Sequence, residues 1–176
     1  IYLKLLGGLL NNTDAITISS DQLMKKYDFL YKHKPKVSVI PFGTAEPSRG
    51  AVRPETESYI LAVGRMVKYK GFDVLLRALS NTEIKIIFIG EGPEREKLES
   101  LSKSLNINST FLGAVEDSLL NQYLAHCELL VLPSISESES FGLVLIEAMS
   151  YAKPIIASDL GTGINDIVQN NVNGFL

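Results

Sequence analysis

The sequence predicts an α/β fold, namely a Rossmann-like doubly wound parallel sheet with helices on both faces. Two observations support this prediction. Short runs rich in Val, Ile and Leu alternate along the chain with segments of helical periodicity, which is the pattern of repeated strand–helix units. Most of the short runs, such as Leu129–Leu132, are almost continuously apolar, and strands buried on both faces have this composition.

Seven segments are predicted to be strands, and two of them precede a polar stretch without apolar periodicity. They are Ala15–Ser19, Lys36–Ile40, Tyr59–Val63, Lys85–Ile89, Thr110–Leu112, Leu129–Leu132 and Pro154–Ala157. The final residues, Gly174–Leu176, resemble the beginning of a further strand, and the chain starts without Met. We therefore expect the sequence to be part of a longer protein.

Four helices are predicted between these strands. The first has an apolar stripe at helical spacing, formed by Phe72, Leu75, Leu76 and Leu79. The second is expected to start at Pro93, with Glu94 and Glu96 near the positive end of its dipole and Leu98, Leu101 and Leu105 on its core face. In the third, which carries Leu120, Tyr123 and Leu124, Asp117 is the expected N-cap. The fourth spans Leu143–Ser150.

Composition limits the classes of partner. The chain has 176 residues, of which 45% are hydrophobic and 21% charged, as in an ordinary globular domain. A net charge of -3 provides no basic surface for nucleic acid and no strong attraction to an anionic membrane. No apolar run is long enough for a membrane-spanning helix. The single cysteine, Cys127, excludes an intrachain disulfide and is interpreted as a buried small hydrophobe.

The polar stretch Gly43–Ser58 divides the chain. It contains Pro47, Gly50 and Pro54 and no apolar period, which is typical of an exposed loop. We therefore expect residues 1–43 to lead into the domain from a neighbouring domain or a hinge, residues 44–58 to form an exposed connection, and residues 59–176 to form the ligand-binding domain.

Ligands of open parallel sheets bind at the carboxyl ends of the strands, so residues that directly follow a strand are the first candidates. After Tyr59–Val63 come Gly64, Arg65 and Lys70. A planar guanidinium and a mobile ammonium together suit a diphosphate. A solvated basic loop would explain these residues as well. The Gly90-Glu91-Gly92-Pro93 segment is a weak phosphate signal, because the dinucleotide fingerprint is not completed.

The segment after Leu129–Leu132 is more informative. Gly142, at the start of the fourth helix, leaves N–H groups open to a phosphate. Glu139 precedes that helix and Glu147 lies inside it among apolar residues. Glu139 could simply be an acidic residue that favours the positive end of the helix dipole, and Glu147 a solvated residue of the helix. A carboxylate beside a buried face, however, needs a partner. A sugar nucleotide would explain the combination, because its diphosphate suits the N–H groups and cations while its hydroxyls suit the carboxylates.

Several motifs together resemble the GT-B retaining glycosyltransferases of family 4, from about Ala15 to the last residue. The motifs, in the family's order, are Gly64-Arg65-Met66-Val67 with Lys70-Gly71, Gly90-Glu91-Gly92-Pro93-Glu94, Phe111-Leu112-Gly113, Pro133-Ser134, Glu139 and Glu147 with Ala148-Met149, Lys153-Pro154-Ile155-Ile156-Ala157-Ser158-Asp159, and Asn173-Gly174-Phe175-Leu176. The resemblance implies the C-terminal, donor-binding half of a GT-B fold.

The resemblance also implies site residues. Arg65, Lys70 and Glu139 would be the catalytic group, with the two cations on the diphosphate of the leaving group and the carboxylate on the transferred sugar. Glu147 would accept from the ribose hydroxyls. The further donor-binding residues would be Gly64 and Glu91, the segment Gly113–Val115 with Val115 near the nucleobase, and Phe141, Gly142 and Leu143 around sugar and phosphate. Neither glutamate is assigned as a nucleophile.

The implied function is transfer of a hexose from a sugar nucleotide to a glycan or lipid-linked acceptor in surface polysaccharide synthesis. GDP-mannose is the expected donor, with a UDP-sugar as the alternative. No cofactor is expected, and no metal either, since no Asp-x-Asp pair is present. The whole enzyme is expected in the cytoplasm, with peripheral attachment to the inner face of the membrane. The alternative functions are a non-catalytic nucleotide-sugar-binding module or another GT-B enzyme, such as a sugar-nucleotide epimerase.

Two departures from the family pattern limit this transfer of roles. Gly161–Asp166 replaces the family's Gly-Gly-x-x-Glu, so no contact after Asp159 is assigned. In the family, the acceptor site and a catalytic histidine come from an N-terminal domain, and neither His33 nor His126 matches that histidine. We therefore expect this chain alone to bind donor but to transfer little.

Overall fold

A computed structural model describes residues 2–47 and 52–176, and its largest element is a parallel sheet of six strands. The strand order is β5-β4-β3-β6-β7-β8, and all neighbouring strands are parallel. The strands are β3 (Ile60–Val63), β4 (Ile86–Ile89), β5 (Ser109–Gly113), β6 (Leu129–Leu132), β7 (Ile155–Ala157) and β8 (Gly174–Phe175). The predicted α/β fold is confirmed.

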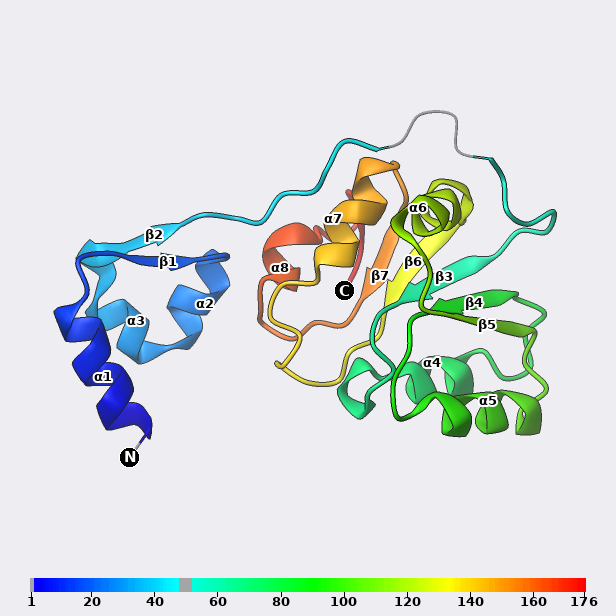
Figure 1. Ribbon diagram of the computed structural model, residues 1–176, viewed down its shortest axis with the longest axis horizontal. Coiled ribbons are helices and arrows are strands. Elements are labelled where there is room, and N and C mark those ends of the chain that lie inside the picture. The colour runs from blue at the N-terminus through cyan, green and yellow to red at the C-terminus, as the bar shows by residue number, and fades with distance from the viewer. Residues whose placement is uncertain (1, 48–51) are drawn as a thin grey trace.

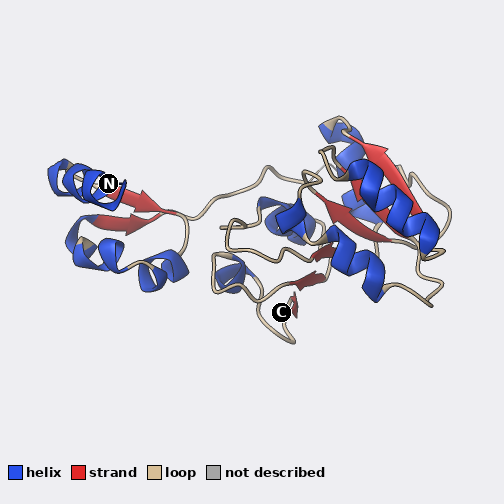
Figure 2. Ribbon diagram, turned by 90° about the horizontal axis from the view of Figure 1, so that it is seen from below, coloured by secondary structure: helices blue, strands red, loops and turns tan. Residues whose placement is uncertain are grey.

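Helices cover both faces of this sheet (Figures 1 and 2). One face carries α4 (Phe72–Ala78) and α5 (Arg95–Ser104), and the other carries α6 (Asp117–His126), α7 (Leu143–Ser150) and α8 (Ile164–Ile167). Successive strand residues point to opposite faces. In β3, Leu61 accordingly packs in the core beneath α6 and α7, whereas Ala62 packs beneath α4 and α5. The continuous apolar runs in the sequence follow from this double burial.

The chain first runs outward from β3 through β4 to β5, and then crosses back to β6, β7 and β8 on the other side of β3. The direction of winding therefore reverses between β3 and β6. Ligands of such sheets bind at this switch point, outside the carboxyl ends of the two strands. Gly64 follows β3 and Pro133 follows β6, so the residues after these two strands share the expected ligand-binding edge.

The N-terminal part forms a separate unit. Its elements are α1 (Tyr2–Asn12), β1 (Ile16–Ile18), α2 (Asp21–Lys26), α3 (Asp28–Lys32), the 3-10 helix η1 (Lys34–Lys36) and β2 (Val37–Val39). Strands β1 and β2 make a parallel sheet of two strands, and β2 continues into an extended segment up to residue 47 (Figure 1). Residues 43–47 of this segment are exposed, and residues 48–51 of the predicted connection, including Gly50, lie outside the described residues.

Polar contacts of Ser20 and Lys26 hold the N-terminal unit against the larger one. The hydroxyl of Ser20, which caps α2, donates to Asp166 Oδ2 of α8 at 2.6 Å. At the other end of α2, Lys26 pairs with Glu137 at 2.9 Å and also donates to the carbonyl of Leu160 at 3.3 Å. Helix α2 is thereby attached to the segment before α7 and to the segment around α8.

Two helix starts differ from the prediction. Helix α5 begins at Arg95, because Pro93 and Glu94 form the turn before it. The N-cap of α6 is Glu116, whose side chain makes no capping hydrogen bond, and Asp117 is the first helical residue. The carboxylate of Asp117 still lies in the first turn, where the helix dipole favours it. The capping prediction was therefore wrong by one residue.

Cys127 is buried, as predicted. It is 2% exposed at the end of α6, and burial raises the pKa of its thiol to about 11. Its Sγ donates weakly to the carbonyl of Leu124 at 3.4 Å. The thiol is protonated at neutral pH and packs as an apolar group.

Candidate functional site

A cavity of about 320 Å³ lies at the switch point. Six of the predicted donor-binding residues line it: Gly64, Lys70, Glu139, Phe141, Gly142 and Leu143. They come from the segment after β3, the segment after β6 and the start of α7. The fold thus brings together residues as far apart in the chain as Gly64 and Leu143, because β3 and β6 are adjacent in the sheet.

Gly64 makes room for Lys70 at the end of β3. It has φ +146, and a Cβ there would lie 3.2 Å from both Cε and Nζ of Lys70. The short 3-10 helix η2 (Lys68–Lys70) brings the chain back over this glycine, so the lysine side chain crosses the strand end. A side chain at position 64 would be strained and would displace the ammonium group.

Lys70 and Glu139 form an ion pair in the wall of the cavity. Nζ of Lys70 lies 2.5 Å from Oε2 of Glu139, and each side chain is only 11% exposed. The hydroxyl of Ser134 donates to the same oxygen at 2.9 Å. Oε1 of Glu139 has no partner among the described residues and is not sealed from solvent. The carboxylate is therefore held through one oxygen and open to the cavity through the other.

Helix α7 starts at the cavity. Its N-cap is Gly142, in the left-handed conformation with φ 79 and ψ 62. A Cβ at this position would lie 3.0 Å from side-chain atoms of Leu132 and Leu145, so the close packing and the backbone both require glycine. The N–H groups of Leu143 and Val144 have no acceptor among the described residues. Such groups at a helix start favour an anion.

Glu147 lies in a second cavity of about 320 Å³, which adjoins the first at Leu143. This cavity is bordered by residues 43–47 and by Asp117 and Asn121 of α6. The carboxylate of Glu147 is half-buried and has no hydrogen-bond or ion-pair partner among the described residues. Burial raises its pKa, and the nearby Asp117 raises it further. An unpaired carboxylate in such a place is suited to accept from ligand hydroxyls.

Arg65 does not line either cavity. It is exposed, and it makes no hydrogen bond or ion pair with the described residues. It directly follows Gly64 at the end of β3, so its long side chain is free to turn toward an anion near Lys70. The structure places the two cations on the same segment but brings only Lys70 into the site.

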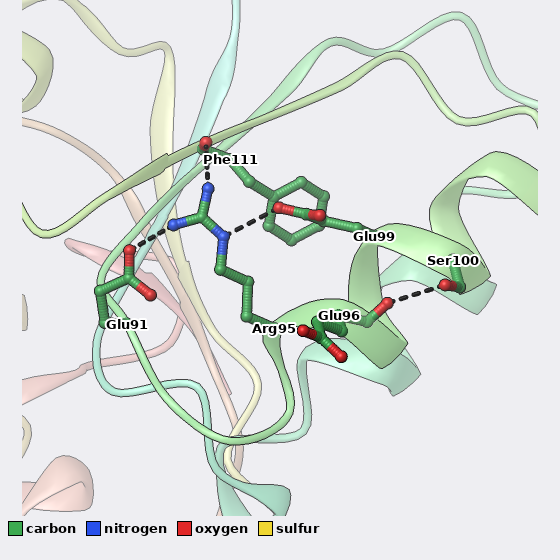
Figure 3. A network of polar contacts seen from close by, with 6 residues as sticks. All are labelled: Glu91, Arg95, Glu96, Glu99, Ser100 and Phe111. Atoms are coloured by element: carbon green, nitrogen blue, oxygen red, sulfur yellow. Dashed lines mark hydrogen bonds and ion pairs between the residues drawn. The ribbon is translucent and has the colours of Figure 1, made fainter.

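Glu91, Gly113 and Val115 are apart from the cavity at the switch point. Figure 3 shows Arg95 between Glu91 and Glu99, with its guanidinium also donating to the carbonyl of Phe111. A Cβ on Gly113 would meet the Glu91–Arg95 pair, and Val115 packs against the core. These predicted residues therefore cluster at the ends of β4 and β5, where Glu91 is engaged in a network within the protein.

Besides Val63, Ser140 and Val144, which are neighbours in sequence of predicted residues, sequence reasoning missed Phe42 and Ser134. Phe42, from the segment after β2, lines the first cavity and packs edge-on against Phe141, with ring centroids 5.1 Å apart. No sequence signal identifies it, because it lies in the segment after β2, far along the chain from the other residues that line the cavity. Ser134 is fully buried behind Glu139. Its position directly after the central strand β6, within the Pro133-Ser134 motif, could have identified it.

The segment after Asp159, to which no role was assigned, holds the two units together. Asn165 donates to Asp159 at 2.7 Å, and Asp166 accepts from Ser20. Each of the two histidines binds the backbone carbonyl four residues before it, and neither lines the two cavities.

Within residues 2–47 and 52–176, no group of three or more His, Cys, Asp or Glu side chains is arranged to hold a metal ion. No helix in these ranges has the length and apolar character needed to cross a membrane.

Two of the known proteins to which the chain is similar are named as glycosyl-transferring enzymes. The chain is 32% identical over 186 residues to D-rhamnosyltransferase WbpZ of Pseudomonas aeruginosa, covering 99% of this chain and 48% of the relative. It is 31% identical to O-antigen chain mannosyltransferase C of Escherichia coli, covering 99% of this chain and 49% of that protein. The chain thus spans about half the length of these relatives.

Solved structures share the fold. Sucrose-phosphate synthase of Thermosynechococcus elongatus superposes with a TM-score of 0.81 at 26% identity, covering 99% of this chain and 47% of the other. HepE of Anabaena, in complex with UDP-glucose, also gives a TM-score of 0.81, at 23% identity, covering 99% and 52%. Residues 45–176 match the family Glycosyl transferases group 1. The chain therefore belongs to the glycosyl transferases group 1 family.

Proposed function

We propose that this chain is the donor-binding part of a retaining hexosyltransferase, corresponding to the C-terminal half of a GT-B enzyme of family 4. Its substrate would be a sugar nucleotide, and the acceptor a glycan or a lipid-linked glycan in surface polysaccharide synthesis. Since the chain spans about half of its relatives, the acceptor site is assigned to a further domain. The proposed location is the cytoplasmic side of the membrane.

One observation carries this proposal. In a single cavity, the ammonium of Lys70, the open Oε1 of Glu139 and the free N–H groups at the start of α7 converge. The cation and the N–H groups suit a phosphate. The carboxylate would repel a phosphate but would accept strongly from a sugar hydroxyl. A ligand that carries phosphate and sugar side by side satisfies both requirements.

The second cavity would hold the nucleoside part of the same ligand. Glu147 lies on α7 behind Leu143, which borders both cavities. A nucleoside placed there would offer its ribose hydroxyls to the unpaired carboxylate. We assign the nucleobase to the region of Gly113 and Val115, at the end of β5.

During transfer, negative charge develops on the departing nucleotide diphosphate. Lys70, together with Arg65 after a side-chain rotation, would stabilise that charge, and such stabilisation is a large catalytic term in many enzymes. Glu139 would orient the sugar through its hydroxyls. It is not assigned as a nucleophile, because a nucleotide diphosphate is already a good leaving group and the two-carboxylate scheme of glycoside hydrolysis does not transfer to it.

GDP-mannose remains the proposed donor, with a UDP-sugar as the alternative. The mannosyltransferase named among the relatives supports the former. A protein of the same fold has been solved with UDP-glucose, which supports the latter. No cofactor or metal is included in the proposal.

A thermal-shift panel tests the proposal. UDP, GDP and ADP, each alone and as its sugar nucleotide, are added to the chain at rising concentration. A ligand at 100 times its Kd stabilises the native state by about 2.7 kcal/mol, which corresponds to a rise in Tm of roughly 5–11 °C for a chain of this size. The absence of a shift with every nucleotide, at concentrations that saturate a control transferase, would refute the donor site.

Two substitutions test the division of labour. Glu139→Ala is expected to weaken binding of the sugar nucleotide more than binding of the free nucleotide. Glu147→Ala is expected to weaken both equally, because the ribose is common to both ligands. Titration calorimetry measures the four affinities. Equal behaviour of the two variants would contradict the assigned roles.

A further inference from the structure

The site contains a buried hydroxyl that the proposed reaction does not use directly. Ser134 follows Pro133 at the carboxyl end of β6, the strand next to β3 at the centre of the sheet. It is 0% exposed and does not line the cavity. Its hydroxyl donates to Glu139 Oε2 at 2.9 Å. We propose that Ser134 is a positioning residue that fixes the Glu139 carboxylate for recognition of the donor sugar, an inference that rests on the proposed function.

The two oxygens of Glu139 have different surroundings. Oε2 receives both Lys70 Nζ and the hydroxyl of Ser134, whereas Oε1 has no partner among the described residues and remains open to solvent. A carboxylate anchored through one oxygen has a defined direction for the other. Ser134 thus acts behind the carboxylate, and the ligand meets only Oε1.

Lys70 alone is a poor anchor once the donor is present. Its ammonium lies in the cavity wall, where the diphosphate is proposed to bind, so the phosphate competes with Glu139 for the same cation. The hydroxyl of Ser134 is neutral and sealed behind the carboxylate. No ligand group reaches it, and its hydrogen bond remains when Lys70 turns toward the phosphate. The serine therefore maintains the orientation of Glu139 in the complex.

The test compares Ser134→Ala with Ser134→Thr, which keeps the hydroxyl. For each variant, calorimetry gives the affinity for a nucleoside diphosphate and for the corresponding sugar nucleotide. In Ser134→Ala, affinity for the sugar nucleotide is expected to fall about tenfold, as for a lost hydrogen bond to a charged group. Affinity for the free diphosphate is expected to stay within about twofold. In Ser134→Thr the ratio of the two affinities is expected to return toward the wild-type value, even if the added methyl group lowers Tm.

A matched control separates positioning from general loss of stability. Ser102 is also a buried serine, 3% exposed, and its hydroxyl bonds to that of Ser109 at 2.5 Å, away from both cavities. Ser102→Ala is expected to leave both affinities unchanged.

Three results would overturn the positioning role: an unchanged ratio in Ser134→Ala, a ratio that falls equally in Ser134→Thr, or the same fall in Ser102→Ala. Each of them leaves the donor site intact, provided that the wild type binds sugar nucleotide. Failure of the wild type to bind any nucleotide overturns the proposed function as well.

Discussion

Replacement of Lys70 by Met tests the ion pair in the cavity wall. The ammonium lies 2.5 Å from Oε2 of Glu139, and the two side chains are each 11% exposed. Without Lys70, the carboxylate keeps only the hydroxyl of Ser134 as a partner. Removal of one member of a buried pair costs roughly 3–5 kcal/mol. Because Oε1 borders the cavity and water can reach it, we expect a smaller loss of about 2–3 kcal/mol, still above that of an exposed pair.

The double variant Lys70→Met/Glu139→Gln removes both charges at once. The uncompensated carboxylate is then absent, so the free energy of unfolding is expected to return to within about 1 kcal/mol of wild type. The coupling between the two substitutions is the decisive quantity, because a double-mutant cycle cancels effects that each change has alone.

Urea unfolding followed by far-ultraviolet circular dichroism measures these free energies, since the chain has no Trp for fluorescence. The single variant should also lower Tm by roughly 4–12 °C. Lys97→Met is the control: Lys97 pairs with Glu94 at 2.7 Å, but its side chain is 74% exposed, so a loss below about 0.5 kcal/mol is expected. If Lys70→Met costs no more than this control, or if the two single losses add in the double variant, the reasoning is refuted.

Four further predictions concern Cys127, Glu147 and Gly64. At pH 8 the native thiol of Cys127 should react with a thiol reagent about a hundredfold slower than in urea, because burial raises its pKa to about 11; equal rates would contradict its burial. Because of the same pKa shift, the protonated thiol contributes fully to the stability of the folded chain below its ordinary pKa, and this contribution is lost as pH rises toward 11. Cys127→Ala should therefore remove the share of the alkaline decline in unfolding free energy that is due to this thiol. Burial raises the pKa of the Glu147 carboxyl, so its ionised form destabilises the folded chain at pH values above that pKa. Glu147→Gln should therefore raise Tm at pH 7, where the carboxyl is ionised, but not at pH 4. A gain in Tm of the same size at both pH values would count against the pKa shift. Gly64→Ala should cost about 1–3 kcal/mol in urea unfolding, and more than Gly161→Ala. At Gly161 φ is +60, within the left-handed region that other residues visit, whereas at Gly64 φ is +146 and a Cβ would also meet the side chain of Lys70; equal costs would contradict the strain at position 64.

Local composition was sufficient to predict the elements of the large sheet. The predicted strands Lys85–Ile89 and Leu129–Leu132 correspond to β4 (Ile86–Ile89) and β6 (Leu129–Leu132). Every residue of these two strands is apolar, because helices cover both faces of the sheet. Helix α7 has the predicted bounds, Leu143–Ser150. The helix starts at Arg95 and Asp117 were missed by one or two residues, since the choice of cap depends on the backbone conformation of one residue.

Three short helices, α2, α3 and α8, were not predicted, and neither was the longer α1 (Tyr2–Asn12). Helices α2, α3 and α8 have 6, 5 and 4 residues, which is too short for a periodic pattern to be recognised. Their positions depend on contacts with distant residues, as in the bond between Ser20 and Asp166. No local signal in either segment points to the other.

The sequence by itself determined the α/β class and the set of polar residues at the ends of the strands, because both depend on short-range patterns. Only the tertiary structure decided which of these residues meet. Lys70 and Glu139 become an ion pair because β3 and β6 are neighbours in the sheet, whereas Arg65 stays exposed and Glu91 pairs with Arg95. The structure also adds Phe42 and Ser134, because strand order and the path of the connecting segment are set by long-range packing, which no local pattern encodes.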